Sequence, residues 1–330
     1  MLKDMNRAYS PRLLLLLALV AHAPCHAAAA AQTFPARSVR VIVTTSPGGG
    51  VDITMRTVGQ KLTETWGRAV VVDNRTGASG IIGLDLAAKA PPDGHTLVVI
   101  TAGHAGHAAT HAKLPYDLLR DFAPVTEMVT TYYLLLAHPS VGVQSVQDLV
   151  ALAHSKPGTL VYGSTGTGQT SHLSWVQFAA ATRMDLVHVP YKGSGQALAE
   201  LLAGHIDLTF ATPLESIPYV QANKLRALAV SSSTRSRALP DLPTVAESGV
   251  PGYEASGWYG VVAPAATPRA IVLTLNDSFV RVLRLPEIVE RFAKSGIDTV
   301  GSTPEQFRAR LQSETERWKR IAKIAGIAKQ

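Results

Sequence analysis

The chain has 330 residues, of which 46% are hydrophobic and 17% charged, with 26 Gly, 20 Pro and one Cys. This composition excludes a disordered chain, a collagen and a disulfide-stapled scaffold, and leaves a globular chain of about two domains. The formal charge of +7 is only mildly basic. The charged cluster at residues 316–320 is interpreted as a solvated helix face, so we expect no nucleic-acid partner.

The first 31 residues have the three parts of a secretory signal. Positive charges end at Arg12, an apolar run covers residues 13–20, and small residues at 27–31 offer Ala-x-Ala cleavage sites. The apolar run is much shorter than the roughly 20 residues that span a bilayer. We therefore expect a signal peptide over residues 1–31 and a periplasmic protein that begins near Gln32. Cys25 lies inside the signal, in a poor context for lipid attachment.

Short β-branched runs alternate with amphipathic segments along the rest of the chain. Strands are predicted over residues 39–43, 69–72, 96–101, 132–137, 186–189, 206–211 and 225–231. Met55, Val58 and Leu62 repeat at helical spacing after the first strand. The alternation predicts the α/β class, with mostly parallel sheets covered by helices on both faces.

Capping patterns mark further helix starts. Ser145-x-x-Asp148 precedes one amphipathic segment, and Thr303 precedes a proline with Gln306 three residues after the cap. Thr267 before Pro268 has the same appearance. The C-terminal third is predicted to be mostly helical.

The first of two glycine-rich turns joins the 39–43 strand to the Met55 helix. It reads Thr44-Thr45-Ser46-Pro-Gly-Gly-Gly50-Val-Asp52. Consecutive glycines let backbone approach a ligand, and the unpaired N–H groups of a helix start attract an anion. A tight turn without a ligand is the structural alternative.

The second turn, at residues 163–172, follows the segment Leu160-Val-Tyr162. It approaches the phosphate-binding pattern G-x-x-x-x-G-K-[ST], with Gly163, Gly168 and Thr170, but Gln169 stands where the lysine belongs. Without that cation the loop suits a carboxylate better than a nucleotide. A solvent-exposed loop is the alternative. Because parallel sheets bind ligands at the carboxyl ends of their strands, two such turns can face each other across a cleft and share one small anion.

The chain resembles the Bug-type solute-binding receptors, the extracytoplasmic binding proteins of tripartite tricarboxylate transporters. The likeness runs from about residue 34 to the C-terminus and rests on SVRVIV (38–43), GGGVD (48–52), VVVDNRTGA (70–78), AKAPPDGHTL (88–97), LPYD (114–117), DFAPV (121–125), YGSTGTG (162–168), HVPYKG (188–193), KLRALAV (224–230), LPDLP (239–243) and PGYE (251–254).

This resemblance implies a two-lobed periplasmic-binding-protein fold of type II, a Venus flytrap, in which the chain crosses between lobes twice. Lobe one is assigned to residues 33–127 plus 253–330 and lobe two to residues 128–252. The family closes around a small carboxylate, such as an amino acid, a di- or tricarboxylate or an aromatic acid. Carried over by position, the ligand-binding residues are Thr45, Ser46, Gly49, Gly50, Asp52, Thr101, His104, Ser164, Gly166, Gly168, Gln169, His172 and Asp207.

Several of these assignments carry an alternative. Thr44 and Thr45 stand where the family has a proline and an aromatic residue, so we expect a smaller or more polar pocket wall. Asp52 is expected to cap a helix rather than to contact ligand, and Asp207 either orients a ligand cation or ends a strand in water. Lys192 adds charge at the cleft rim or lies in a solvated loop.

The run His104-x-x-His107-x-x-x-His111 lines one helical face. Such spacing is able to bind zinc, but a solvated or partly buried face is the commoner outcome. We predict no metal and no cofactor.

The predicted function is capture by closure, without catalysis, for membrane transporter subunits, by a protein expected to be a monomer. A ligand sensor for a signalling partner is the first alternative, and a hydrolase or transferase the second. The sequence has no G-x-S-x-G, no H-E-x-x-H and no P-loop lysine, which argues against the common enzyme classes.

Overall fold

The computed structural model describes residues 34–324 of the chain. The predicted signal peptide, with Cys25, therefore lies outside the described residues. Within them, no helix is both long and apolar enough to cross a membrane.

Six strands form the first sheet, in the order β11-β4-β10-β3-β1-β2. Their bounds are β1 Val39–Val43, β2 Val70–Asn74, β3 Thr96–Thr101, β4 Phe122–Tyr132, β10 Ser256–Pro264 and β11 Ile297–Thr299. Strand β1 pairs parallel with β2 and β3, whereas β10 pairs antiparallel with β3 and β4. Strand β11 continues the antiparallel half of the sheet beside β4.

Five strands form the second sheet, in the order β7-β6-β8-β5-β9. Their bounds are β5 Leu134–Ala137, β6 Val161–Ser164, β7 Val187–Pro190, β8 Leu208–Ala211 and β9 Arg226–Val230. Strand β6 pairs parallel with β7 and β8, and β5 pairs antiparallel with β8 and β9.

Both sheets are thus mixed, not mostly parallel as predicted from the sequence. Strands β4, β10 and β11 were absent from the prediction, and two of them occupy the middle of the first sheet. Strand β10 contains Gly257 and Gly260, which weaken the pattern of a strand. A Cβ at Gly260 would lie 2.1 Å from the ring of Phe307, so this glycine makes room for a helix to pack on the sheet.

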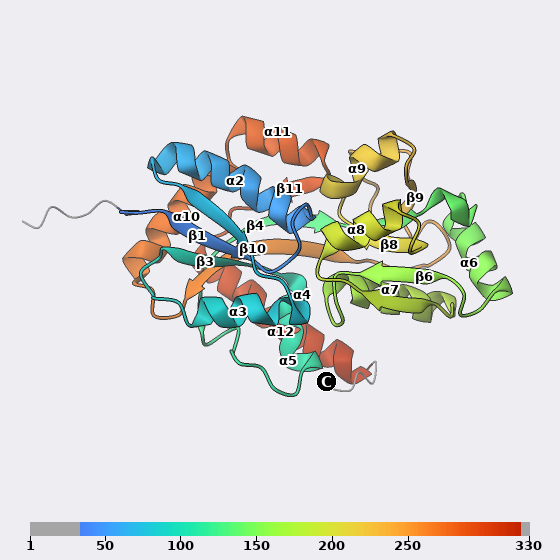
Figure 1. Cartoon of the computed structure of the whole chain (residues 1–330), viewed down its shortest axis with the longest axis horizontal. Coiled ribbons are helices and arrows are strands. Elements are labelled where there is room, and N and C mark those ends of the chain that lie inside the picture. Colours follow the sequence, from blue (N-terminus) through green and yellow to red (C-terminus); the bar gives the residue numbers. More distant parts are fainter. Residues whose placement is uncertain (1–33, 325–330) are drawn as a thin grey trace, which may run out of the picture. The chain divides into compact units, whose positions relative to one another are not determined.

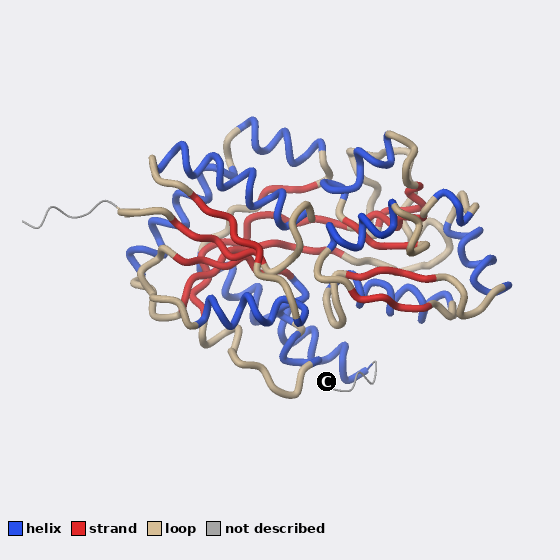
Figure 2. The backbone as a smooth tube through the Cα atoms, in the orientation of Figure 1, coloured by secondary structure: helices blue, strands red, loops and turns tan. Residues whose placement is uncertain are grey.

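Helices cover both faces of each sheet, as the tube in Figure 2 makes visible. Their bounds are α2 Gly50–Trp66, α3 Ile81–Ala88, α4 Ala102–Ala105, α5 His107–Thr110, α6 Val146–Ser155, α7 Thr170–Thr182, α8 Ser194–Leu202, α9 Pro213–Gln221, α10 Arg269–Leu283, α11 Pro286–Lys294 and α12 Pro304–Ile324, with 3₁₀ turns η1 Ala78–Gly80 and η2 Pro139–Val141. We call the first sheet with α2–α5 and α10–α12 lobe one, and the second sheet with α6–α9 lobe two (Figure 1).

The alternating side chains of buried strands divide each lobe into two cores. In β1, Val41 and Val43 face the core formed with α2, α10 and α11, whereas Ile42 faces α3 and α12. In β5, Leu135 packs with α6 and α7, and Leu136 packs with α8 and α9. The central strands are therefore buried on both faces, which holds the loops at their ends on rigid supports.

The chain passes between the lobes twice, after β4 and before β10. Ser231 joins the two passages: its hydroxyl accepts from the N–H of Tyr133 at 2.8 Å and donates to the carbonyl of Ala255 at 2.5 Å. Its backbone N–H also donates to Tyr133 O, at 2.8 Å. Strand β4 stays in the first sheet to Tyr132, and the residue boundaries assigned to the lobes remain a prediction.

Of the three helix caps predicted for hydroxyl side chains, two are confirmed. Ser145 accepts from the N–H of Asp148 at 3.1 Å, and Thr303 accepts from the N–H of Gln306 at 3.2 Å. The third is wrong, because α10 has Pro268 as its N-cap and the buried hydroxyl of Thr267 has no hydrogen-bond partner among the described residues. The charged cluster at residues 316–320 is also more than a solvated face, since Trp318 is buried in the lobe-one core.

Candidate functional site

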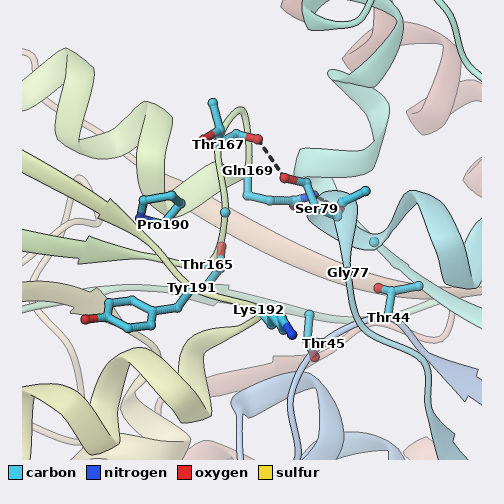
Figure 3. A pocket seen from close by; sticks show the side chains of 13 residues that line it. Thr44, Thr45, Gly77, Ser79, Thr165, Thr167, Gln169, Pro190, Tyr191 and Lys192 are labelled. Atoms are coloured by element: carbon cyan, nitrogen blue, oxygen red, sulfur yellow. Dashed lines mark hydrogen bonds between the residues drawn. The ribbon is translucent and has the colours of Figure 1, made fainter. Parts of the chain in front are cut away.

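A cavity of about 200 Å³ lies between loops of the two lobes. Its walls are mostly hydroxyl side chains and glycine backbone, and Lys192 is the only charged residue among the described residues that line it. Figure 3 shows Lys192 and Thr45 on one side of the cavity and Ser79 with Thr167 on another. The lining residues are Thr44, Thr45, Gly77, Ala78, Ser79, Gly80, Thr165, Gly166, Thr167, Gln169, Pro190, Tyr191 and Lys192.

The loop of residues 77–80 in lobe one touches the second glycine turn in lobe two. The Ser79 hydroxyl donates to the carbonyl of Thr167 at 2.9 Å, drawn as a dashed line in Figure 3. The amide of Gln169 donates to the carbonyl of Ser79 and lies 3.0 Å from Nε2 of His107. Ala78 and Ser79 have positive φ of 44° and 54°, a conformation that non-glycine residues rarely adopt. These contacts close one end of the cleft.

A second, smaller cavity of about 40 Å³ shares Thr45, Thr165 and Gln169 with the first. Among the described residues that line it, Glu215 is the only one with a charged side chain. Its lining residues are Thr45, Val51, Thr101, Tyr133, Thr165, Gln169, Thr170, Ser194, Phe210, Thr212, Glu215 and Tyr259.

The first glycine turn packs directly on lobe two. A Cβ at Gly50 would lie 2.3 Å from Oγ1 of Thr212, and one at Gly49 would lie 2.5 Å from Oγ of Ser194. Ser46 extends this contact, because its N–H donates to Lys192 O at 3.1 Å. Gly49 and Gly50 are therefore required for close approach of the two lobes.

Glu215 accepts a hydrogen bond from the N–H of Gly50, at the helix start where the sequence predicted an anionic ligand. Its Oε2 accepts from the N–H of Gly50 at 2.9 Å, and its Oε1 accepts from the N–H and hydroxyl of Thr212 at 2.9 and 3.0 Å. Burial raises the pKa of Glu215, and the hydrogen bonds from Ser194, Thr212 and Gly50 oppose that shift. The start of α2 is thus occupied by a carboxylate of the protein itself.

The hydroxyl of Thr45 is buried and has no hydrogen-bond partner among the described residues. Thr45 lines both cavities. An unpaired buried hydroxyl costs about 1–3 kcal/mol, so this atom is suited to receive a hydrogen bond from, or donate one to, a bound molecule.

Of the predicted ligand-binding residues, Thr45, Gly166 and Gln169 line the larger cavity and Thr101 lines the smaller one. Ser46, Gly49 and Gly50 lie at the lobe contact beside these cavities. Direct contact of any of them with a ligand remains a prediction.

Asp52 belongs to a network within lobe one. It is 3% exposed and accepts from the N–H of Gly48, from Nε of Arg56 and from the amide of Asn74, each at 3.0 Å. Burial acts to raise its pKa, but these hydrogen bonds lower the pKa overall. Asp52 holds the glycine turn in place, although the N-cap of α2 is Gly49 and no side chain caps it.

Ser164 and His172 each accept a hydrogen bond from a backbone N–H of the second glycine turn. The fully buried Ser164 hydroxyl accepts from the N–H of Gly166 at 3.2 Å and lies 2.7 Å from Nε2 of His188. His172 accepts from the N–H of Gly168 at 3.1 Å, and its ring stacks on His188 with centroids 4.3 Å apart. Neither Ser164 nor His172 lines a described cavity of the cleft.

The prediction for Asp207 fails on position. Asp207 precedes β8, so it lies at the amino end of the strand, where its carboxylate accepts from the N–H of Val161 at 2.7 Å. The carboxyl end of β8 instead leads to Thr212 and Glu215 at the cleft.

His104 is 2% exposed and lines neither cavity of the cleft. Its Nδ1 accepts from the N–H of Thr101 at 2.9 Å, completing a capping box at α4. Burial lowers its pKa to about 3. No group of three or more His, Cys, Asp or Glu side chains in residues 34–324 is arranged to hold a metal ion.

The cleft residues that the sequence analysis missed follow two further strands. The turn at residues 77–80 comes after β2, and of its glycines only Gly77 entered the sequence analysis, as part of the family resemblance. Thr212 and Glu215 come after β8 and form a capping box, with the pattern T-x-x-E that marks a helix start. That pattern was available in the sequence.

Comparisons with known proteins agree on one family. The profile of TctC, the tripartite tricarboxylate transporter family receptor, matches residues 54–327. Protein BugT of Bordetella pertussis is 34% identical over 313 residues, which cover 93% of this chain and 95% of BugT.

Solved structures of related proteins have the same fold. R. palustris Rpa4515 with adipate is 36% identical with a TM-score of 0.87, covering 90% of this chain and 100% of that one. MatC from Rhodopseudomonas palustris with bound malate is 29% identical with a TM-score of 0.83, covering 88% and 100%. The chain therefore belongs to the tripartite tricarboxylate transporter receptor family, a family of periplasmic solute-binding proteins, not of enzymes, that includes the Bug proteins.

Proposed function

We propose that this chain binds a small carboxylate in the cleft between its lobes and delivers it, as a monomer, to the membrane subunits of a tripartite transporter. The solved relatives contain adipate and malate, which supports a carboxylate as the ligand. The signal at residues 1–31 is proposed to export the chain to the periplasm.

The observation that carries this proposal is the composition of the larger cavity. Hydroxyls of Thr45, Ser79 and Thr165 and one cation, Lys192, surround about 200 Å³. A carboxylate pairs with such donors, whereas the described part of the wall offers no second cation for a phosphate chain. The unpaired hydroxyl of Thr45 is a contact that we assign to the ligand.

Closure follows from the same geometry. A ligand that contacts both Thr45 in lobe one and Gln169 in lobe two stabilises the closed form by its greater affinity for that form. A membrane partner is then able to distinguish loaded from empty receptor by the relative position of the lobes.

A thermal-shift screen of the mature protein tests the proposal. Amino acids, mono-, di- and tricarboxylates and aromatic acids form the panel, with nucleotides and neutral sugars as controls. A ligand at about 100 times its Kd adds roughly 2.7 kcal/mol to the free energy of unfolding. A response to nucleotides or sugars, with silence toward every acid, would overturn the proposed ligand class. Light scattering that finds a stable dimer would overturn the monomer.

A further inference from the structure

We propose that Glu215 restricts the ligand to acids with a single carboxylate, whose other end is uncharged or carries a hydrogen-bond donor. The inference rests on the proposed function and names the ligand class of the same cleft.

Opposite charges line the two cavities of the cleft. Lys192 is the charged residue at the larger cavity and Glu215 the charged residue at the smaller one, among the described residues that line each. The two cavities share Thr45 and Gln169. A ligand that fills both cavities therefore meets a cation in the larger one and an anion in the smaller one.

The hydrogen bonds of Glu215 favour its ionised form and oppose the burial that raises its pKa. The N–H groups of Gly50 and Thr212 can only donate, and each reaches a different carboxylate oxygen at 2.9 Å. The hydroxyl of Thr212 gives a third hydrogen bond, at 3.0 Å. A carboxylate accepts all of these, and the starts of α2 and α9 also favour a negative charge at this position.

No described cation neutralises this charge. None of the ion pairs within residues 34–324 includes Glu215, and the smaller cavity has no lysine, arginine or histidine in its described lining. Like charges that are close together in a buried site repel strongly. A second ligand carboxylate placed there would face Glu215 without a counter-ion.

The remaining walls of the smaller cavity suit the other end of such an acid. Tyr133, Tyr259 and Ser194 have hydroxyl groups, while Phe210 and Val51 add apolar surface. An alkyl, hydroxyl or ammonium end fits these neighbours. The second carboxylate of a dicarboxylate does not fit there, because it would lie beside the charge of Glu215.

Calorimetry with acid pairs of equal length tests the inference. The probes are 4-hydroxybutanoate against succinate and 6-hydroxyhexanoate against adipate, measured with the mature full-length protein and with its Glu215→Gln variant. In the wild type we expect the hydroxy acid to bind at least ten-fold more tightly than its dicarboxylate partner. In Glu215→Gln we expect that ratio to fall at least ten-fold, because the charge is gone while the side-chain shape is kept.

The ratio between two acids in one protein cancels any general loss of closure caused by the substitution. Glu200→Gln, a charge removal on α8 outside both cavities, is the matched control, and we expect it to keep the wild-type ratio. Tighter binding of the dicarboxylate by wild type, or an unchanged ratio in Glu215→Gln, would overturn the inference and leave the receptor function standing. If the variant does not fold, the wild-type ratio decides alone. Binding of no acid at all would overturn both proposals.

Discussion

The substitution Gly50→Ala tests whether the first glycine turn exists to let the lobes approach each other. Gly50 is the first residue of α2, and an added Cβ would lie 2.3 Å from Oγ1 of Thr212 and 3.0 Å from the hydroxyl of Tyr259. The conformation of the backbone itself does not forbid alanine here, because the position has no positive φ. The clash therefore arises where lobe one meets lobe two.

Forcing an extra methyl group into a packed contact costs about 1–3 kcal/mol. If ligand binding requires this contact, affinity falls by about 5- to 150-fold, since each 1.4 kcal/mol is a factor of ten. The lobes are able to relieve the clash by separating, so we expect the ligand-free protein to lose less stability than the complex. Isothermal calorimetry with the best acid of the thermal-shift screen and thermal unfolding without ligand measure the two effects.

Gly48→Ala is the matched control. Gly48 has a φ of 76°, and a Cβ there would meet nothing within 4 Å. The substitution imposes about 1–2 kcal/mol of backbone strain but touches no residue of the other lobe. We expect reduced folding stability with unchanged affinity, the reverse of Gly50→Ala.

A second substitution separates the clash from other effects. Thr212→Ala in the Gly50→Ala background removes the atom that the new methyl group meets, so we expect part of the lost affinity to return. Wild-type affinity in Gly50→Ala, or the same loss in Gly48→Ala, would refute the reasoning, as would a double variant whose losses simply add.

Three further predictions concern single side chains. Gln169→Ala removes the amide that donates to Ser79 across the cleft and leaves buried polar groups unpaired, so carboxylate binding should weaken by about 1–3 kcal/mol. An unchanged affinity in calorimetry would show that Gln169 is not part of the site. Lys192→Met should weaken carboxylate binding by less than about 1 kcal/mol, because the side chain is exposed, and this loss of affinity should vanish at high salt. Lys192→Arg should retain binding. A loss of affinity in Lys192→Met that grows with salt would contradict the role of charge. Burial lowers the pKa of His104 to about 3. In the unfolded chain this imidazole therefore binds a proton from about pH 6.5 downward, whereas in the folded chain it does not. The free energy of unfolding should decrease as the pH falls from about 6.5 toward 3. His104→Gln keeps an acceptor for the N–H of Thr101 without titrating, so it should flatten this decrease in denaturant titrations; a pH slope equal to that of wild type would contradict the assignment.

The sequence predicted strands that are rich in β-branched residues and missed, among others, one in which a glycine makes room for a side chain of another element. Strand β1 has the sequence VRVIV, with β-branched residues at every position but Arg40, and it was predicted with its observed bounds, Val39–Val43. Strand β10 carries Gly260 because Phe307 of α12 occupies the space of its side chain. Such a requirement comes from a residue far along the chain, so no local pattern reveals it.

For the cleft, the glycine turns were found but their partners were not. The sequence placed Gly50 at a helix start with free N–H groups, yet Glu215 accepts from its N–H in the folded chain. That pairing depends on how the two lobes meet. Asp207 was misplaced for a simpler reason: as the second residue of the predicted strand at residues 206–211 it already belonged to the amino end, whereas the carboxyl end of β8 is Ala211.

The bonding of Ser231 to both passages bears on how the receptor moves. The buried side chain of Ser231 forms hydrogen bonds with both Tyr133 and Ala255. The two segments that link the lobes are therefore joined to each other at one point and are not independent linkers. Swinging about that point preserves its hydrogen bonds, whereas sliding one half past the other breaks them. The hydrogen bonds of Ser231 therefore favour opening by rotation about this point, and the proposed membrane partner would then distinguish open from closed receptor by the angle between the lobes.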